Sequence, residues 1–135
     1  MMSANGLIKK FSVALMGSTL VACANKAPVD KFEAAWNEGQ HNERQTVDGA
    51  RYMKNMVVWL GPALTQSTAA CQRYPNEPEH RSARLVILLG LNGSVREAMV
   101  RPSNPRWVCV KDSLAGKVFP APPRDAFWTS GDIEL

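Results

Sequence analysis

An apolar stretch, a turn signal and a second strand-like stretch constrain the fold of this chain more than any other feature. Residues 84–91 read RLVILLGL and residues 94–101 read SVREAMVR. Between them stands Asn92-Gly93, the dipeptide most typical of a two-residue hairpin turn, because both residues tolerate positive φ. We therefore expect an antiparallel β-hairpin whose apolar face is covered by another layer of structure.

The segment before the hairpin favours helices. Residues 32–38 (FEAAWNE) predict one or two helical turns, and the polar residues 39–42 predict a loop or a frayed connection. Thr46 or Asp48 is expected to cap a longer helix that is buried around much of its girth. Its apolar residues form two strips, Ala50, Met53, Val57 and Leu60, and Tyr52, Met56 and Trp59.

Gly61-Pro62 predicts the end of that helix, because proline disfavours a helix interior. A second helix is expected from Pro62 to about Arg73, and the proline-rich residues 74–82 predict a loop.

The residues after the hairpin predict a helix, an extended segment and a last strand. The helix is expected from Asn104 or Pro105 to Gly116, with Cys109 roughly opposite its apolar stripe. That stripe consists of Trp107, Val110, Leu114 and Val118. Prolines hold residues 118–123 extended, and residues 127–135 (FWTSGDIEL) predict the strand. This order of elements indicates a two-layer α+β domain.

The amino terminus is organised like an export signal. Lys9 and Lys10 precede the apolar and small residues 11–22, FSVALMGSTLVA, and no acidic residue precedes Asp30. This run is shorter than the roughly 20 residues that span a bilayer core. The pattern is typical of a cleavable secretory signal and not of a membrane-spanning helix.

The end of this segment, Leu20-Val21-Ala22-Cys23, resembles the lipobox of bacterial lipoproteins. In that family the cysteine thiol receives a diacylglycerol group, the signal is cut just before it, and the new amine is acylated. The resemblance implies that residues 1–22 are a signal peptide and that Cys23 is the lipid attachment site. Ala24 stands where an aspartate would favour the inner membrane, so the implied location is the periplasmic face of the Gram-negative outer membrane.

Removal of the signal would leave residues 23–135, enough for one domain with a modest core. We divide this part into a lipid-anchored tether with a short helix, residues 23–45, and an α+β domain, residues 46–135. The full chain has 16 Lys+Arg and 12 Asp+Glu; without Lys9 and Lys10, 14 basic residues face 12 acidic ones. The charges are scattered, whereas nucleic-acid binding usually needs a clustered basic face, so no nucleic-acid partner is expected.

Two cysteines remain, Cys71 and Cys109. An even pair in a small exported domain favours one disulfide. In the chain-entropy model, closing this loop would stabilise the folded state by about 3–4 kcal/mol. Two free thiols and a metal site are the alternatives. A metal site would need partners, and neither His41 nor His80 stands at ligand spacing to a cysteine.

Motifs of catalysis are missing from the sequence. It contains no G-x-S-x-G, no H-E-x-x-H and no phosphate-binding glycine loop. Both histidines lie in polar or proline-rich stretches, where solvated side chains are expected. A nucleophile pair of Cys71 and His80 is conceivable, but an oxidised Cys71 could not act. We expect no enzyme, no cofactor and no metal.

The hairpin, the helix carrying Cys109 and the segment 119–123 (FPAPP) together resemble the C-terminal domain of the TonB-like family. In that family a strand, a glycine turn and a second strand precede a helix, an FPPP-like or FPAPP-like segment and a last strand. The match covers residues 84–135. Residues 46–73 resemble the helical lead-in of small exported proteins that carry this domain and a cysteine pair.

This resemblance implies a TonB-C-like hairpin–helix–strand fold and a habit of binding proteins by strand addition. It does not imply energy transduction, because the transducers have a transmembrane helix and a long proline-rich spacer, whereas Ala24–Asp30 is a short tether. We expect a membrane-anchored adaptor that binds an envelope protein, with Trp128, Thr129 and Ser130 as its binding edge. The alternative is a structural component of an envelope secretion or assembly complex.

Overall fold

The computed structural model describes residues 28–134, so the predicted signal peptide and Cys23 lie outside the described residues. The elements follow the order α1 (Lys31–Gln45), α2 (Val47–Ala70), a 3-10 turn (Pro78–His80), β1 (Ser82–Leu89), β2 (Val95–Arg101), α3 (Pro105–Ser113) and β3 (Phe127–Glu134). The predicted α+β class is confirmed, and so is the hairpin followed by a helix and a last strand.

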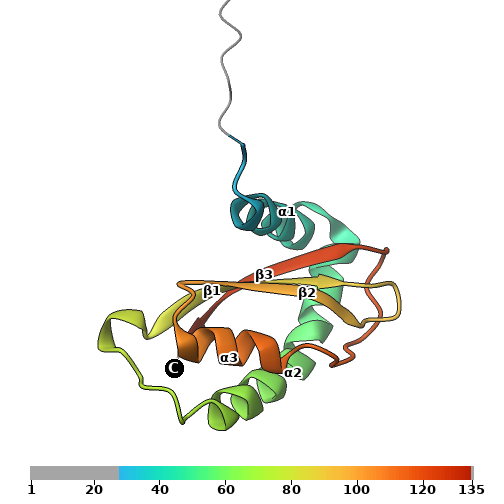
Figure 1. Ribbon diagram of the computed structural model, residues 1–135. Helices are drawn as coiled ribbons and strands as arrows, with labels where there is room; N and C mark the ends of the chain where they lie inside the picture. Colours follow the sequence, from blue (N-terminus) through green and yellow to red (C-terminus); the bar gives the residue numbers. More distant parts are fainter. Residues whose placement is uncertain (1–27, 135) are drawn as a thin grey trace, which may run out of the picture.

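The three strands form one antiparallel sheet in the order β2-β1-β3. Helix α1 covers one face of the sheet, and α2 and α3 cover the other (Figure 1). The two predicted layers, the sheet and the helices α2 and α3, are present, and α1 adds a third layer on the other face. The reason lies in β1, where Leu85, Val86 and Ile87 are all buried. A continuous apolar run, unlike an alternating one, is typical of a strand covered on both faces.

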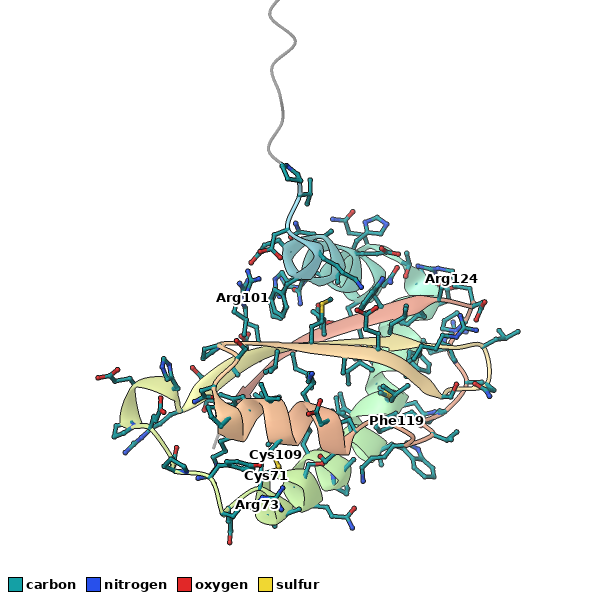
Figure 2. All side chains as sticks on the ribbon, in the orientation of Figure 1. Cys71, Arg73, Arg101, Cys109, Phe119 and Arg124 are labelled. Atoms are coloured by element: carbon teal, nitrogen blue, oxygen red, sulfur yellow. A yellow bond between two sulfur atoms is a disulfide. The ribbon has the colours of Figure 1, made fainter. Side chains whose placement is uncertain are left out.

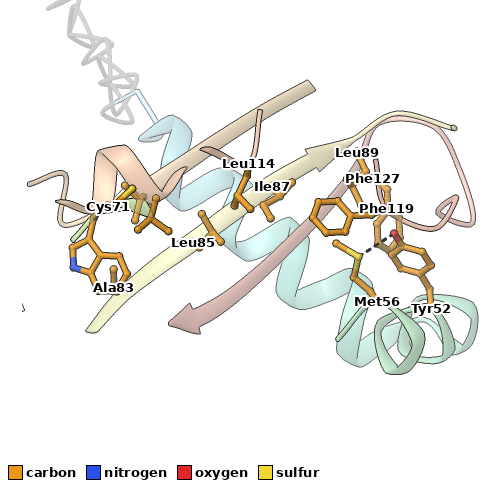
Figure 3. Close-up of a cluster of buried hydrophobic side chains, with 13 residues drawn as sticks. Tyr52, Met56, Cys71, Ala83, Leu85, Ile87, Leu89, Leu114, Phe119 and Phe127 are labelled. Carbon is orange, nitrogen blue, oxygen red and sulfur yellow. Dashed lines mark hydrogen bonds between the residues drawn. The ribbon is translucent and has the colours of Figure 1, made fainter. Parts of the chain in front are cut away.

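The main core fills the space between the sheet and the pair α2 and α3 (Figure 3). Strand β1 contributes Leu85, Ile87 and Leu89, and the fully buried Trp107 of α3 donates its indole N–H to the His80 carbonyl at 2.8 Å. Tyr52 of α2 packs edge-on against Phe127. A buried hydroxyl needs a hydrogen-bond partner, and the Tyr52 hydroxyl donates to the Pro120 carbonyl at 2.8 Å.

A smaller core lies under α1 on the opposite face. Phe32 and Ala35 of α1 are buried there against Val86 of β1. Trp36, Met99 and Trp128 are partly buried around them. Helix α1 therefore belongs to the packed domain, although the sequence placed it with the tether.

Helix α1 is longer than predicted, because residues 39–42 are helical and not a loop. Asp30 caps its start by accepting a hydrogen bond from the Phe32 amide at 2.9 Å. Gly39 lets the helix approach β3 closely, since a Cβ built there would lie 2.6 Å from Oγ of Ser130. The fully buried Asn42 bonds to the same strand. Tertiary contacts thus hold helical a stretch whose polar composition favours a loop.

Helix α2 begins as predicted, with the Thr46 hydroxyl accepting from the Gly49 amide at 3.2 Å. It does not end at Gly61-Pro62, however, and Pro62 lies inside one continuous helix. Proline in a helix interior costs about 3 kcal/mol. Burial of Met56 before it and of Ser67 after it holds both halves in place.

The burial of α2 was also overestimated. Tyr52 and Met56 are buried, but Val57 and Trp59 are 59% and 57% exposed. One face of the helix is covered by the sheet and α3, and no described element covers the other.

The hairpin turn differs from the predicted two-residue turn. The Gly93 amide donates to the Gly90 carbonyl at 2.8 Å, and the Gly90 amide donates to the Ser94 carbonyl at 2.9 Å, so the loop has three residues. Only Gly93 takes positive φ, 84°, and Asn92 does not. Asn92 instead accepts hydrogen bonds from the Ser94 amide and hydroxyl. A three-residue loop with glycine at the left-handed position is the next commonest hairpin connection.

Helix α3 is capped by Asn104, which accepts from the Trp107 amide at 3.2 Å. Trp107, Val110 and Leu114 are buried as predicted. Val118 is 65% exposed, contrary to prediction, because the helix has ended and the chain is extended there. In an extended segment neighbouring side chains point to opposite sides, and it is Phe119 that enters the core.

Candidate binding edge at strand β3

Strand β3 lies at one edge of the sheet, as predicted for the last strand. Part of its outer side is already occupied by α1. Asn42 donates its side-chain amide to the Trp128 carbonyl at 3.0 Å, and the Glu43 carboxylate accepts from the Ser130 amide at 3.0 Å. These bonds show that the backbone groups of Trp128 and Ser130 point away from β1.

The end of the strand carries no such cover. Strand periodicity places the amide and carbonyl of Asp132 on the same outer side as those of Trp128 and Ser130. No strand of residues 28–134 pairs with β3 on this side. The part of the edge that is open to a further strand is therefore residues 131–134, which we call the open end of β3.

A cavity of about 310 Å³ lies beside the open end, between the sheet and α2. Gly131 lines it from β3, on the face that also carries the core residues Phe127 and Ile133. A Cβ built on Gly131 would meet no atom within 4 Å. The lining is mainly apolar and includes Met53, Leu60, Leu64, Leu85, Ile87 and Ile133.

The charged residues that line the cavity, Glu43 and Asp132, are acidic. Glu134 ends the strand, and Arg106 lines a neighbouring hollow together with it. Partial burial raises the pKa of the Glu43 carboxyl, and the hydrogen bond from Ser130 only partly opposes this shift. Arg84 lies opposite Asp132 in the sheet register, but its guanidinium is paired with Glu33 at 2.6 Å.

The residues predicted as the binding edge take different positions. Trp128 is half-buried in the smaller core, whereas Thr129 and Ser130 are buried. Ser130 also accepts a hydrogen bond from the Gln40 side-chain amide at 2.9 Å. These three residues are therefore largely engaged within the domain. Whether they bind a partner stays a prediction, and the open end next to them is the accessible stretch.

Sequence reasoning missed Glu43, Gly131 and the cavity. Gly131 carried the one usable signal, because a glycine inside a strand often marks a close backbone approach or a ligand. Glu43 gave none, since it stood in a stretch that was expected to be tether and loop.

Cys71 and Cys109 form a disulfide that joins the end of α2 to α3, with an S–S distance of 2.09 Å (Figure 2). The Cys71 sulfur is therefore not free to serve as a nucleophile with His80. Nε2 of His80 lies 3.5 Å from a carboxylate oxygen of Glu77, and the His41 ring is hydrogen-bonded to the Gln45 side chain. Within residues 28–134 no three side chains of His, Cys, Asp or Glu are grouped as a metal site.

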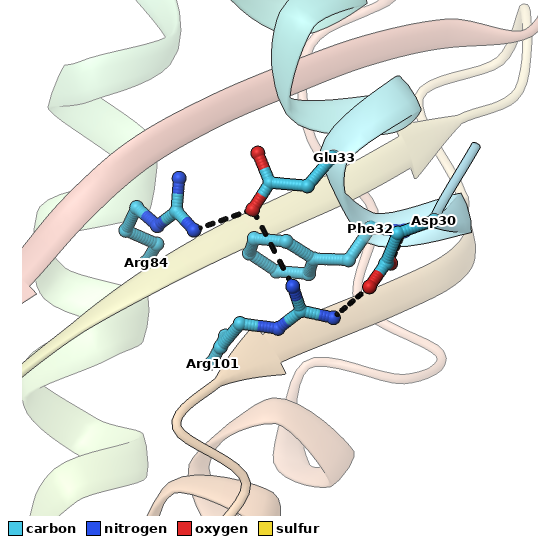
Figure 4. Close-up of polar contacts among 5 residues, drawn as sticks. All are labelled: Asp30, Phe32, Glu33, Arg84 and Arg101. Atoms are coloured by element: carbon cyan, nitrogen blue, oxygen red, sulfur yellow. Dashed lines mark hydrogen bonds and ion pairs between the residues drawn. The ribbon is translucent and has the colours of Figure 1, made fainter. Parts of the chain in front are cut away.

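A polar cluster fixes the start of α1 to the sheet (Figure 4). Arg101 bonds to Asp30 at 2.8 Å, and Arg84 bonds to Glu33 at 2.6 Å. Both guanidinium groups lie over the ring of Phe32, 4.5 and 5.2 Å from its centroid. The hydrogen bond from Arg101 is the main reason why the pKa of Asp30 lies below its usual range. The cluster therefore fixes the first turn of α1 to the sheet.

Comparison of the chain with protein-family models, with curated proteins and with solved structures found no match in any of the three. The resemblance to the TonB-like family thus rests on the sequence motifs alone. Among the described helices, none combines the length and the apolar character that a membrane span requires.

Proposed function

We propose that this protein is a lipid-anchored adaptor of the bacterial outer membrane that binds an envelope protein and has no catalytic activity. The observation that carries the proposal is the open end of β3, an edge strand beside an apolar cavity. Unpaired backbone groups on an edge invite a further strand, and strand addition is a recurring mode of peptide recognition.

The export and lipid signals in the sequence support the location. Six residues separate Cys23 from Asp30, where the packed domain begins, so the two lie seven Cα–Cα steps apart. Such a tether spans at most about 25 Å, because an extended chain covers roughly 3.5 Å per residue. A domain held this close to its membrane suits local recruitment. The tether is far too short to carry force across the periplasm.

The order of elements supports a TonB-C-like relationship as a hypothesis. A strand, a turn, a second strand, α3, the FPAPP segment and β3 follow one another as in that family. Within this hypothesis the protein shares a fold and a binding habit with the family and not the task of an energy transducer.

The proposal can be tested by site-specific photo-crosslinking in the native bacterium. A photoreactive residue at Asp132 should capture a defined partner, and one at Val58, which is also exposed but lies on the outer side of α2, should not. A weak or conditional partner would indicate an adaptor, and a stoichiometric complex would indicate the alternative, a structural component of a secretion or assembly machine. Identical products at both positions, or none at Asp132, would contradict the proposed site.

The anchor needs a separate test. Mass spectrometry of the mature protein should find acyl chains on Cys23, and Cys23→Ser should abolish both acylation and processing at that residue. A wild-type amino terminus without acyl chains would refute the lipoprotein assignment.

A further inference from the structure

We infer that the segment bound at the open end of β3 is a basic extended peptide, and that one of its bulky apolar side chains fills the cavity at Gly131. This inference rests on the proposed function, because it uses the same edge. It adds the chemistry of the partner: cationic side chains along one face of the bound strand and an apolar side chain on the other.

The cavity supplies the apolar part of the argument. It measures about 310 Å³ and is bounded by apolar side chains of α2 and β1. This is about twice the volume of an engineered apolar cavity that binds benzene, so a leucine or phenylalanine side chain would have room. The space exists because Gly131 has no side chain while Thr129 and Ile133, its neighbours on the same face, have theirs.

Strand geometry explains why a bound peptide would reach this space. A strand added beside β3 would present alternate side chains to the two faces of the sheet. A side chain next to Gly131 would point toward α2 and enter the cavity. Its two sequence neighbours would point to the other face, where the side chains of Asp132 and Glu134 lie with those of Trp128 and Ser130.

The charges supply the cationic part. Glu43, Asp132 and Glu134 lie around the open end, no basic side chain lines the cavity, and Arg106 lines a separate hollow beside Glu134. The nearest arginine in the sheet register, Arg84, is committed to Glu33. An acidic partner would be repelled here, whereas lysine or arginine at alternate positions would pair with Asp132 and Glu134. The recognised pattern is therefore basic–apolar–basic with strand periodicity.

The test uses the mature lipidated protein in nanodiscs of phosphatidylcholine, a neutral lipid that does not attract a basic peptide. The probe is a fluorescent heptapeptide, Lys-Val-Lys-Leu-Lys-Val-Lys, with blocked termini, and binding is followed by anisotropy. Replacing its central leucine by serine should weaken binding about tenfold, as expected for loss of a buried leucine side chain. Replacing its lysines by glutamates should abolish binding.

In the protein, Gly131→Val should fill the cavity. It should weaken binding of the probe at least as much as the leucine-to-serine change in the peptide does. The same variant should keep or raise the melting temperature, because its Cβ meets no neighbour and valine favours strands. If Gly131 had only a structural role, Gly131→Val would lower the melting temperature and leave binding of the probe unchanged. Val58→Ala, at an exposed position away from the cavity, is the control that should bind like the wild type.

Two results separate failure of this inference from failure of the proposed function. Asp132→Pro removes an outward-facing amide that a bound strand needs. If Asp132→Pro abolishes binding but Gly131→Val and the serine peptide bind normally, the edge is correct and the cavity inference is wrong. If Asp132→Pro leaves binding unchanged, the edge itself is wrong. Failure of the lysine peptide to bind, or equal binding of the glutamate peptide, overturns the cationic partner.

Discussion

Gly93 offers a quantitative test of how the hairpin is joined to the rest of the domain. Its φ of 84° is one that residues with a side chain rarely adopt. A Cβ built on it would also lie 1.9 Å from the Phe119 carbonyl oxygen. That carbonyl belongs to a segment fixed beside the turn, since the Phe119 amide donates to the Gly93 carbonyl at 2.9 Å. Alanine at this position therefore meets both backbone strain and a collision.

The same chain contains a glycine that isolates the first of these two effects. Gly116 has a φ of 79°, nearly the same value, but a Cβ there would meet nothing within 4 Å. Gly116→Ala should therefore cost only the left-handed backbone penalty, about 1–2 kcal/mol. Gly93→Ala should cost that amount plus the displacement of residues 117–119, including at least one hydrogen bond, or about 1–3 kcal/mol more.

Urea denaturation of the wild type and the two alanine variants would measure both terms. We expect Gly93→Ala to lower the free energy of unfolding by about 2–5 kcal/mol, a large share of the 5–15 kcal/mol typical of a domain. The two variants should then melt several degrees apart, at about 4 °C per kcal/mol. Equal losses in the two variants would mean that the contact with Phe119 contributes nothing, and that the close packing of this turn has been misjudged.

Three further outcomes are expected. Replacing Cys71 and Cys109 by serine should lower the free energy of unfolding by about 2–5 kcal/mol in urea denaturation, and a non-reduced peptide map that finds both thiols free in the exported protein would contradict the bridge. Asn42→Ala should cost about 1–3 kcal/mol in thermal or chemical unfolding, because the partly buried Trp128 carbonyl loses its donor and the Arg124 guanidinium loses an acceptor; an unchanged stability would show that water replaces the amide. Glu43→Gln should remove one pH-dependent component of stability. Folding raises the pKa of the Glu43 carboxyl, so the folded state binds more protons than the unfolded chain. The free energy of unfolding of the wild type should therefore fall as the pH rises through the Glu43 pKa. Denaturation at several pH values should find this component smaller in the glutamine variant, and an identical pH profile would mean that the carboxyl is fully solvated.

The elements that could be predicted from sequence are those whose signal is local. The hairpin strands, the cap at Thr46, the start of α3 near Asn104 and the proline-held segment before β3 all follow from residues that are close in sequence. The turn itself was nearly correct, because Gly93 does take the left-handed conformation. The segment that packs against the turn, at Phe119, lies far along the chain and leaves no trace in the Asn92-Gly93 dipeptide.

The errors concern elements that depend on distant contacts. Pro62 would end an isolated helix, but the core on both sides of it keeps α2 continuous. Residues 39–42 have a loop-like composition, yet Asn42 is buried because it satisfies a carbonyl of β3. In both cases local propensity, which amounts to a few kcal/mol at most, is outweighed by burial and hydrogen bonding across the domain.

The third layer links these errors to the candidate site. If α1 were a short helix on a tether, the outer side of β3 would be open along its whole length, and Trp128 to Ser130 would be its natural binding stretch. Because α1 is a full helix packed on the sheet, its side chains Asn42 and Glu43 occupy that stretch and leave only the last residues of β3 open. The same helix brings a carboxylate to the rim of the cavity. The position of the candidate site and one of its acidic groups thus both follow from one helix, whose extent was set by contacts that the sequence pattern did not reveal.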